Sequence, residues 1–250
     1  MGVAKIRESF IENRRVMRKV LASRPKSRQR FVWGLDPSLS GTGITILSKD
    51  GRDLYEKEYA GDVSCLTTDP KAKRYARMDY IQQQVSAKLA SHQPLLLVME
   101  DYAYGAKLRR ELLGEVGGVI RMALWQHNVP VILAAPLQLK KFLTGKGGGS
   151  SGSKSAIMME VLDKYGVKTE NDNEADSYVL ARIALALVQY FGSKACRYGS
   201  SITSKKLINH MKKMPVEMKE LGCKQYQWEV VVSLVLNKGG RVADFIREED

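Results

Sequence analysis

The chain has 250 residues, of which 44% are hydrophobic, and its formal net charge is +13 at pH 7. This length allows one hydrophobic core of ordinary size, with residues left over for arms and extensions. So basic a chain favours polyanionic partners, nucleic acid above all, although a basic protein without such a partner is the simpler alternative. No apolar run is long enough to span a bilayer, which argues against a membrane protein.

The cysteines and histidines exclude two further classes of protein. Cys65, Cys196 and Cys223 are odd in number and far apart, so the sequence predicts no disulfide framework and favours a reducing compartment. The three histidines lack the spacing of zinc ligands. The N-terminus also lacks the apolar centre of a signal peptide. We therefore expect a cytoplasmic protein without structural zinc.

Residues 1–30 form a strongly basic segment with ten Lys or Arg residues, among them Arg14 and Arg15. We interpret this segment as an arm that lies on DNA phosphates. A solvated tail and an organellar transit peptide are the alternatives, and Glu8 and Glu12 argue against the second.

The first part of the chain after this arm alternates between short apolar runs and turn residues. Residues 31–36 and 43–48 predict two strands of a hairpin, joined by the turn sequence PSLSGT. Residues 53–60 predict a third strand. Residues 70–92 have the apolar spacing of a helix, and the run LLLVMED after Pro94 predicts a strand that is buried on both faces.

The second part continues as helix, strand and helix over residues 110–127, 129–134 and 136–143, which predicts a mixed α/β sheet flanked by helices. Residues 144–155 are rich in Gly and Ser and predict a flexible loop. Residues 156–165 predict another helix. We expect a strongly apolar helix over residues 174–191, EADSYVLARIALALVQYF, to pack on the sheet. Residues 193–250 form a lysine-rich extension that could bind DNA, strengthen a dimer or cap the core.

Three acidic residues occupy positions where a charge should be costly. Asp36 and Glu100 end apolar strands, and Asp176 lies near the start of the apolar helix. Carboxylates close to a dry sheet need a cation or hydrogen-bond donors, and Mg²⁺ and Mn²⁺ prefer oxygen ligands. Each residue also has an ordinary alternative. Asp36 could cap the turn at Pro37, Glu100 and Asp101 could be solvated, and Asp176 could favour the helix dipole.

Four motifs in order over residues 31–192 resemble those of RuvC-type Holliday junction resolvases of the RNase H-like superfamily, above all phage-encoded members. The motifs are GLDPSLSGTGITIL; VMEDYAYGAK; GEVGGVIRMAL with VPVILAAPLQLKKFLTGKG and SKSAIMMEV; and NDNEADSYVLARIAL. The resemblance implies an RNase H-like nuclease domain over residues 31–192, with a mixed five-stranded sheet. The basic arm would precede this domain, and the extension would follow it.

The same resemblance implies a site and an activity. Asp36, Glu100 and Asp176 match catalytic carboxylates that hold Mg²⁺, or alternatively Mn²⁺, as two ions. Asn173 stands where the family usually has a fourth acid or a histidine, and we expect it to be a metal ligand through its carbonyl oxygen, with Glu174 or Asp172 as possible substitutes. The implied reaction is hydrolysis of branched DNA to 5′-phosphate and 3′-hydroxyl ends by a homodimer, with no small-molecule substrate.

The resemblance also assigns residues to DNA. Lys154 matches a lysine close to the scissile phosphate, and one of two tyrosines after the second acid would stack on a junction base. The residues assigned to DNA are Lys140, Lys141, Lys146, Lys154, Tyr104, Tyr102 and, from the basic arm, Arg14 and Arg15.

Several rival functions compete with junction cleavage. GGGSSGSKS is not a phosphate-binding P-loop, because Ser153 separates the last glycine from Lys154. ATPases of the same fold superfamily share the turn after Asp36 but are usually longer. A non-catalytic junction-binding protein should have lost the carboxylates. An RNase H-like nuclease acting on flaps, forks or RNA–DNA hybrids stays open, and side-by-side cleavage assays would separate it from a resolvase.

Overall fold

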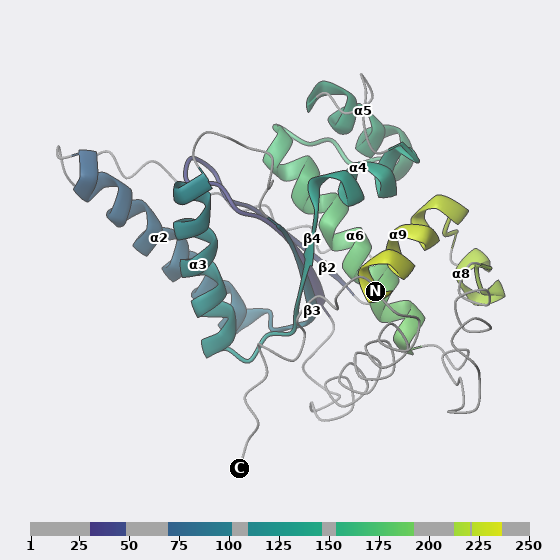
Figure 1. The fold of residues 1–250 in the computed structure, drawn as a ribbon, viewed down its shortest axis with the longest axis horizontal. Coiled ribbons are helices and arrows are strands. Elements are labelled where there is room, and N and C mark those ends of the chain that lie inside the picture. Colours follow the sequence, from purple (N-terminus) through teal and green to yellow (C-terminus); the bar gives the residue numbers. More distant parts are fainter. Residues whose placement is uncertain are drawn as a thin grey trace, which may run out of the picture.

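The computed structural model describes residues 31–48, 70–101, 110–146, 154–192, 213–220 and 222–236. They form a mixed α/β fold around a four-stranded sheet with the strand order β2-β1-β3-β4. Helices cover both faces of this sheet (Figure 1). The predicted class of fold is therefore confirmed. The strand predicted over residues 53–60, which would be a fifth, lies outside the described residues.

The sheet begins with the predicted hairpin. Strand β1 (Phe31–Asp36) pairs antiparallel with β2 (Gly43–Ser48) along its whole length. On its other side β1 runs parallel to β3 (Pro94–Glu100), and β3 pairs in parallel with β4 (Val131–Ala134). Because β1, β3 and β4 run the same way, their carboxyl ends lie at one edge of the sheet.

Two helical layers enclose the sheet (Figure 1). Helices α2 (Pro70–Ser91) and α3 (Arg110–Gln126) cover one face, where Trp33, Leu35 and Met99 belong to one buried cluster. The other face carries α6 (Asp172–Gly192), with α4 (Pro136–Thr144) and α5 (Lys154–Tyr165) packed beside it. Helix α6 lies directly on β1 and β2, as its apolar sequence predicts.

Part of the C-terminal extension belongs to the same core. Helix α8 (Val216–Glu220) packs on α6, and α9 (Gln225–Leu236) packs on α4 and α6. Met218, Trp228 and Val231 are buried in the cluster that α6 forms with the sheet. Of the three roles open to the extension, capping the core is therefore observed for these residues.

Several predicted boundaries differ from the observed ones. The strand expected from Val129 begins at Val131, because α3 ends in a Schellman motif. In this motif Asn128 is left-handed (φ 53°), and the Val129 N–H donates to the Leu124 carbonyl (2.9 Å). The loop expected over residues 144–155 is shorter, because Thr144 ends α4 and Lys154 begins α5.

Within the described ranges, no helix is both long enough and apolar enough to cross a membrane.

Candidate active site

Asp36 and Glu100 end neighbouring parallel strands. The last register pair between β1 and β3 is Leu35 with Met99, so Asp36 and Glu100 are the next residues on each strand. A tight turn follows Asp36, in which the Thr42 hydroxyl donates to the Ser38 carbonyl (2.8 Å) and accepts from the Ser38 N–H (3.2 Å). The two acidic residues therefore lie side by side at the carboxyl edge of the sheet.

The alternation of side chains along the strands places both acids on the face that carries α6. Leu35 and Met99 belong to the buried cluster under α2 and α3, whereas Val98 belongs to the cluster on the α6 side. Successive strand residues point to opposite faces, so Asp36 and Glu100 point to the same side as Val98.

Two glycines let the backbone of α6 approach the sheet very closely. A Cβ atom at Gly34 would lie 1.9 Å from the Ser177 carbonyl oxygen, and one at Gly43 would lie 2.2 Å from that of Asn173. No other residue type fits at these positions without displacing the helix. Gly43 is also the register partner of Asp36. The N-terminal part of α6 therefore lies over the end of β1.

A buried hydrogen bond fixes this helix against β2. The Thr45 and Ser177 hydroxyls are 2.8 Å apart, and the Ser177 hydroxyl also donates to the Glu174 carbonyl (2.9 Å). Asp176 precedes Ser177 and follows Asn173 by three residues, so it lies beside the stripe of α6 that faces the sheet. Close packing and this bond together hold Asp176 near the strand ends.

The surroundings of Glu100 disfavour the charged form of its carboxyl group. Burial, together with the nearby carboxylates of Asp176 and Asp101, raises its pKa to about 8, although Lys140 acts in the opposite direction. Asp176 also has a buried carboxylate oxygen, Oδ1. Two carboxylates this close in a partly dry site cannot both carry a charge cheaply unless a cation joins them. The pair therefore has the chemistry of a divalent-cation site.

Helix α4 brings Lys140 to this edge. Ala134 pairs with Glu100 at the end of β4, and α4 begins two residues later with Pro136 at its first position. The Gln138 side chain accepts from the Ala135 N–H (2.9 Å) and so caps the helix start. The helix therefore begins at the strand end that carries Glu100, and its Lys140 is close enough to lower the pKa of Glu100.

The described part of the chain contains no group of three or more His, Cys, Asp or Glu side chains placed to hold a metal ion together. Asp36, Glu100 and Asp176 share one edge and one face of the sheet, but their carboxylates do not converge into a complete set of ligands. The Asp176 carboxylate repels that of Glu100 electrostatically. The assignment of all three as ligands therefore stays a prediction.

The other predicted residues are distributed as follows. Lys141 forms an ion pair with Glu229 of α9 (2.8 Å), and Lys146 is exposed just after α4. Lys154 begins α5, and its side chain is outside the description. The predicted residues outside the described part of the chain are Arg14, Arg15, Tyr102 and Tyr104.

Glu174, which the sequence offers as a substitute ligand, has a structural role. It is almost fully buried, and its Oε2 atom accepts from the Glu170 N–H (2.7 Å). Its own N–H donates to the Asn171 side chain (3.0 Å), which caps α6. The spacing Asn-x-x-Glu before an apolar helix is the capping-box pattern, and it could have indicated this role from the sequence.

The family model for the crossover junction endodeoxyribonuclease RuvC matches residues 32–186. This match runs from the second residue of β1 into α6, includes all three acidic residues, and ends before α8 and α9. The chain therefore belongs to the RuvC family of crossover junction endodeoxyribonucleases, which are phosphodiester hydrolases. Nucleases of this family are metal-dependent in general.

Individual relatives agree with this assignment. The chain is 27% identical over 167 residues to the RuvC of Dictyoglomus thermophilum, covering 66% of this chain and 99% of that protein. It is 27% identical over 153 residues to the RuvC of Carboxydothermus hydrogenoformans, covering 60% of this chain and 92% of that one.

Among solved structures, the fold is similar to T. thermophilus RuvC in complex with Holliday junction substrate. The TM-score is 0.51 at 22% identity, covering 67% of this chain and 96% of that one. This likeness confirms the RNase H-like fold.

Proposed function

We propose that the protein resolves four-way DNA junctions by Mg²⁺-dependent hydrolysis at the edge formed by Asp36, Glu100 and Asp176. The observation that carries the proposal is that Asp36, Glu100 and Asp176 share one edge and one face of the sheet, within the segment that the RuvC family model matches. Burial and the nearby Asp176 carboxylate also raise the pKa of Glu100, and a bound cation would relieve this effect.

The carboxylates of Asp36, Glu100 and Asp176 would hold two Mg²⁺ ions, with Mn²⁺ as an alternative. When bound, the ions supply a nucleophile at neutral pH and neutralise charge on the phosphate. Asn173 is a candidate fourth ligand, because its backbone lies over Gly43, the register partner of Asp36. The products would be 5′-phosphate and 3′-hydroxyl ends.

Basic side chains would bind the DNA around the carboxylates. Lys140 is already at the site, where it would approach a phosphate brought in by the substrate. Lys146 and Lys154 flank the Gly- and Ser-rich segment between α4 and α5, and Lys154 would offset charge in the transition state. Lys141 would contact DNA only after breaking its ion pair with Glu229.

Two further features support a homodimer acting on a four-way junction. The solved T. thermophilus RuvC holds a Holliday junction substrate, and two-fold symmetry of the protein would match two opposed cuts. The layer of α2 and α3 also exposes large apolar side chains, among them Tyr75 (57% exposed) and Met122 (52%). Such an apolar surface is typical of a subunit interface.

The decisive assay compares the cleavage of a synthetic four-way junction, a replication fork, a flap and an RNA–DNA hybrid, with Mg²⁺ and with EDTA. We expect paired Mg²⁺-dependent nicks in the junction and slower cutting of the other substrates. Preferred cutting of the fork, flap or hybrid would contradict the proposed substrate. Junction binding without any Mg²⁺-dependent nick would contradict the nuclease activity.

A further inference from the structure

We propose that helix α9 is a clamp that holds α4 against α5, and that Tyr226 and Lys164 are positioning residues of the active site. The family match ends at residue 186, so this helix lies beyond the part of the chain that resembles RuvC. The catalytic consequence rests on the proposed function, whereas the clamp itself rests on contacts among described residues.

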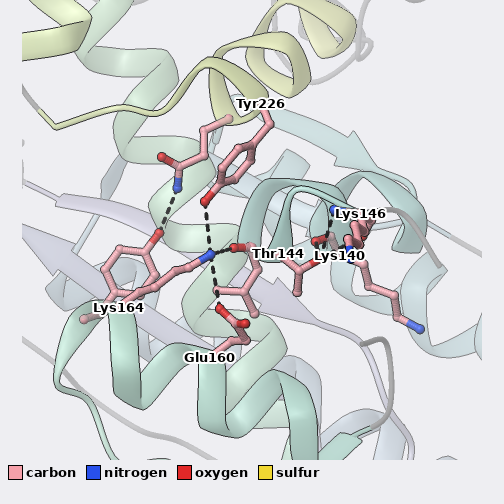
Figure 2. Close-up of polar contacts among 9 residues, drawn as sticks. Lys140, Thr144, Lys146, Glu160, Lys164 and Tyr226 are labelled. Carbon is pink, nitrogen blue, oxygen red and sulfur yellow. Dashed lines mark hydrogen bonds and ion pairs between the residues drawn. The ribbon is translucent and has the colours of Figure 1, made fainter. Parts of the chain in front are cut away.

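Lys164 is the centre of the clamp (Figure 2). Its ammonium group donates to the Tyr226 hydroxyl (3.0 Å) and to the Leu143 carbonyl at the end of α4, and it forms an ion pair with Glu160 (3.2 Å). One side chain of α5 therefore contacts the end of α4 and the start of α9. Partial burial opposes its charge, but the contacts with Tyr226 and Glu160 outweigh this effect and raise the pKa of Lys164.

Tyr226 also covers the point where the chain leaves α4. Gly145 has a left-handed backbone (φ 78°), and its N–H donates to the Lys141 carbonyl (2.9 Å), which ends the helix. A Cβ atom at Gly145 would lie 3.4 Å from the Tyr226 ring, which is ordinary contact distance. The ring therefore lies against the C-terminus of α4 while its hydroxyl accepts from Lys164.

Three more polar contacts connect α9 to the same two helices. On α4, Lys141 pairs with Glu229 (2.8 Å), and the Gln138 side chain donates to the Ser233 hydroxyl (3.0 Å). On α5, the Tyr165 hydroxyl accepts from the Gln227 side chain (3.1 Å). The first turn of α9 thus binds α5 through Tyr226 and Gln227, and its later turns bind α4 through Glu229 and Ser233, as a brace between the two helices would require.

The brace bears on the site through α4, which packs on α5 and α9 as well as on α6. Helix α4 carries Lys140, which interacts with Glu100. By holding α4 in place, α9 therefore fixes the distance between Lys140 and the carboxylates. The rate of the proposed hydrolysis depends on this distance.

The test is the double variant Tyr226→Phe with Glu229→Gln, which removes one polar contact to each helix and keeps the aromatic ring. We expect the single-turnover cleavage rate at saturating four-way junction and Mg²⁺ to fall about tenfold, because contacts to charged groups are lost at both helices. The dissociation constant for the junction without Mg²⁺ should not rise by more than about twofold, because Glu229→Gln also frees Lys141 for the DNA.

Two controls separate positioning from stability. Glu220→Gln removes an equally exposed carboxylate from α8 and should leave the rate unchanged. Val85→Ala removes buried volume from α2, outside the clamp, and should lower the melting temperature without changing the rate well below it. The proposal is overturned if the double variant keeps the wild-type rate, or slows only as much as Val85→Ala does.

Amide hydrogen exchange gives a readout that does not need the nuclease activity. We expect faster exchange at the C-terminal end of α4 and in α5 of the double variant, with the strands unchanged. Unchanged exchange in these helices would overturn the clamp. If the wild-type protein cuts no branched DNA, the proposed function fails, and hydrogen exchange alone then decides whether the clamp exists.

Discussion

At the scale of single residues, the three carboxylates differ in what surrounds them. The Asp176 carboxylate raises the pKa of Glu100, and the charge of Lys140 lowers it. Asp36 reaches the same edge through its place in the register. Their shared chemistry is therefore tested one side chain at a time, with substitutions that keep the shape and remove the charge.

We expect Asp36→Asn and Glu100→Gln each to abolish junction cleavage while junction binding survives. An amide cannot supply the negative charge that a divalent ligand set requires. The measurement is Mg²⁺-dependent cleavage together with an electrophoretic binding assay on the same junction. Full activity of either purified variant would refute the metal-site assignment.

The close packing of α6 on Gly34 predicts that a larger residue at this position lowers the stability of the fold. A methyl group at this position would enter the backbone of α6, so we expect Gly34→Ala to destabilise the fold by about 3 kcal/mol. Gly118→Ala on α3 is the matched control, because a Cβ there meets nothing within 4 Å; it should gain up to about 1 kcal/mol. Urea unfolding at low protein concentration measures both. Equal stability of the two variants would contradict the close approach.

The sequence indicated Asp36, Glu100 and Asp176 because acidic residues at the ends of apolar runs conflict with local burial. It could not indicate that Lys141 pairs with Glu229, 88 positions away, because no local pattern encodes such a contact. Nor could it place the three carboxylates relative to one another to within ligand distance, since that depends on side-chain conformations.

At the scale of elements, alternation and apolar periodicity predicted the hairpin and the helix over residues 174–191 well. They failed at the start of β4, because the Val129 N–H belongs to the helix cap of α3. They also left the role of the extension open. The sequence shows that the extension has apolar residues, but it does not indicate which surface they pack against.

The burial of α9 makes a prediction at this scale. Trp228 is fully buried in the core cluster with α6, so we expect Trp228→Ala to lower the free energy of unfolding by about 3–5 kcal/mol. Chemical denaturation followed by far-UV circular dichroism measures the loss. A change below about 0.5 kcal/mol, typical of a surface position, would mean that the extension is not part of the folded unit.

At the scale of the whole molecule, the charge of +13 predicts salt-dependent DNA binding. Deleting residues 1–30 should weaken junction binding and reduce the slope of log affinity against log salt. Fluorescence anisotropy over a range of salt concentrations measures both. An identical slope for the truncated protein would show that the arm does not lie on phosphates.

The exposed layer of α2 and α3 predicts the oligomeric state. Met122→Glu should convert a dimer into a monomer, because a buried interface tolerates an unpaired charge poorly. Glu111→Gln, at an exposed position near the start of α3, serves as a neutral control. Sedimentation equilibrium distinguishes the two states. A wild-type protein that is monomeric at every concentration would rule the homodimer out.

The most direct test of the whole account is calorimetric titration of Mn²⁺ into the DNA-free protein and into Asp36→Asn, Glu100→Gln and Asp176→Asn. We predict that the wild-type protein binds the ion and that each substitution weakens binding about tenfold or more. Unchanged affinity in all three variants would contradict a shared metal site at this edge of the sheet.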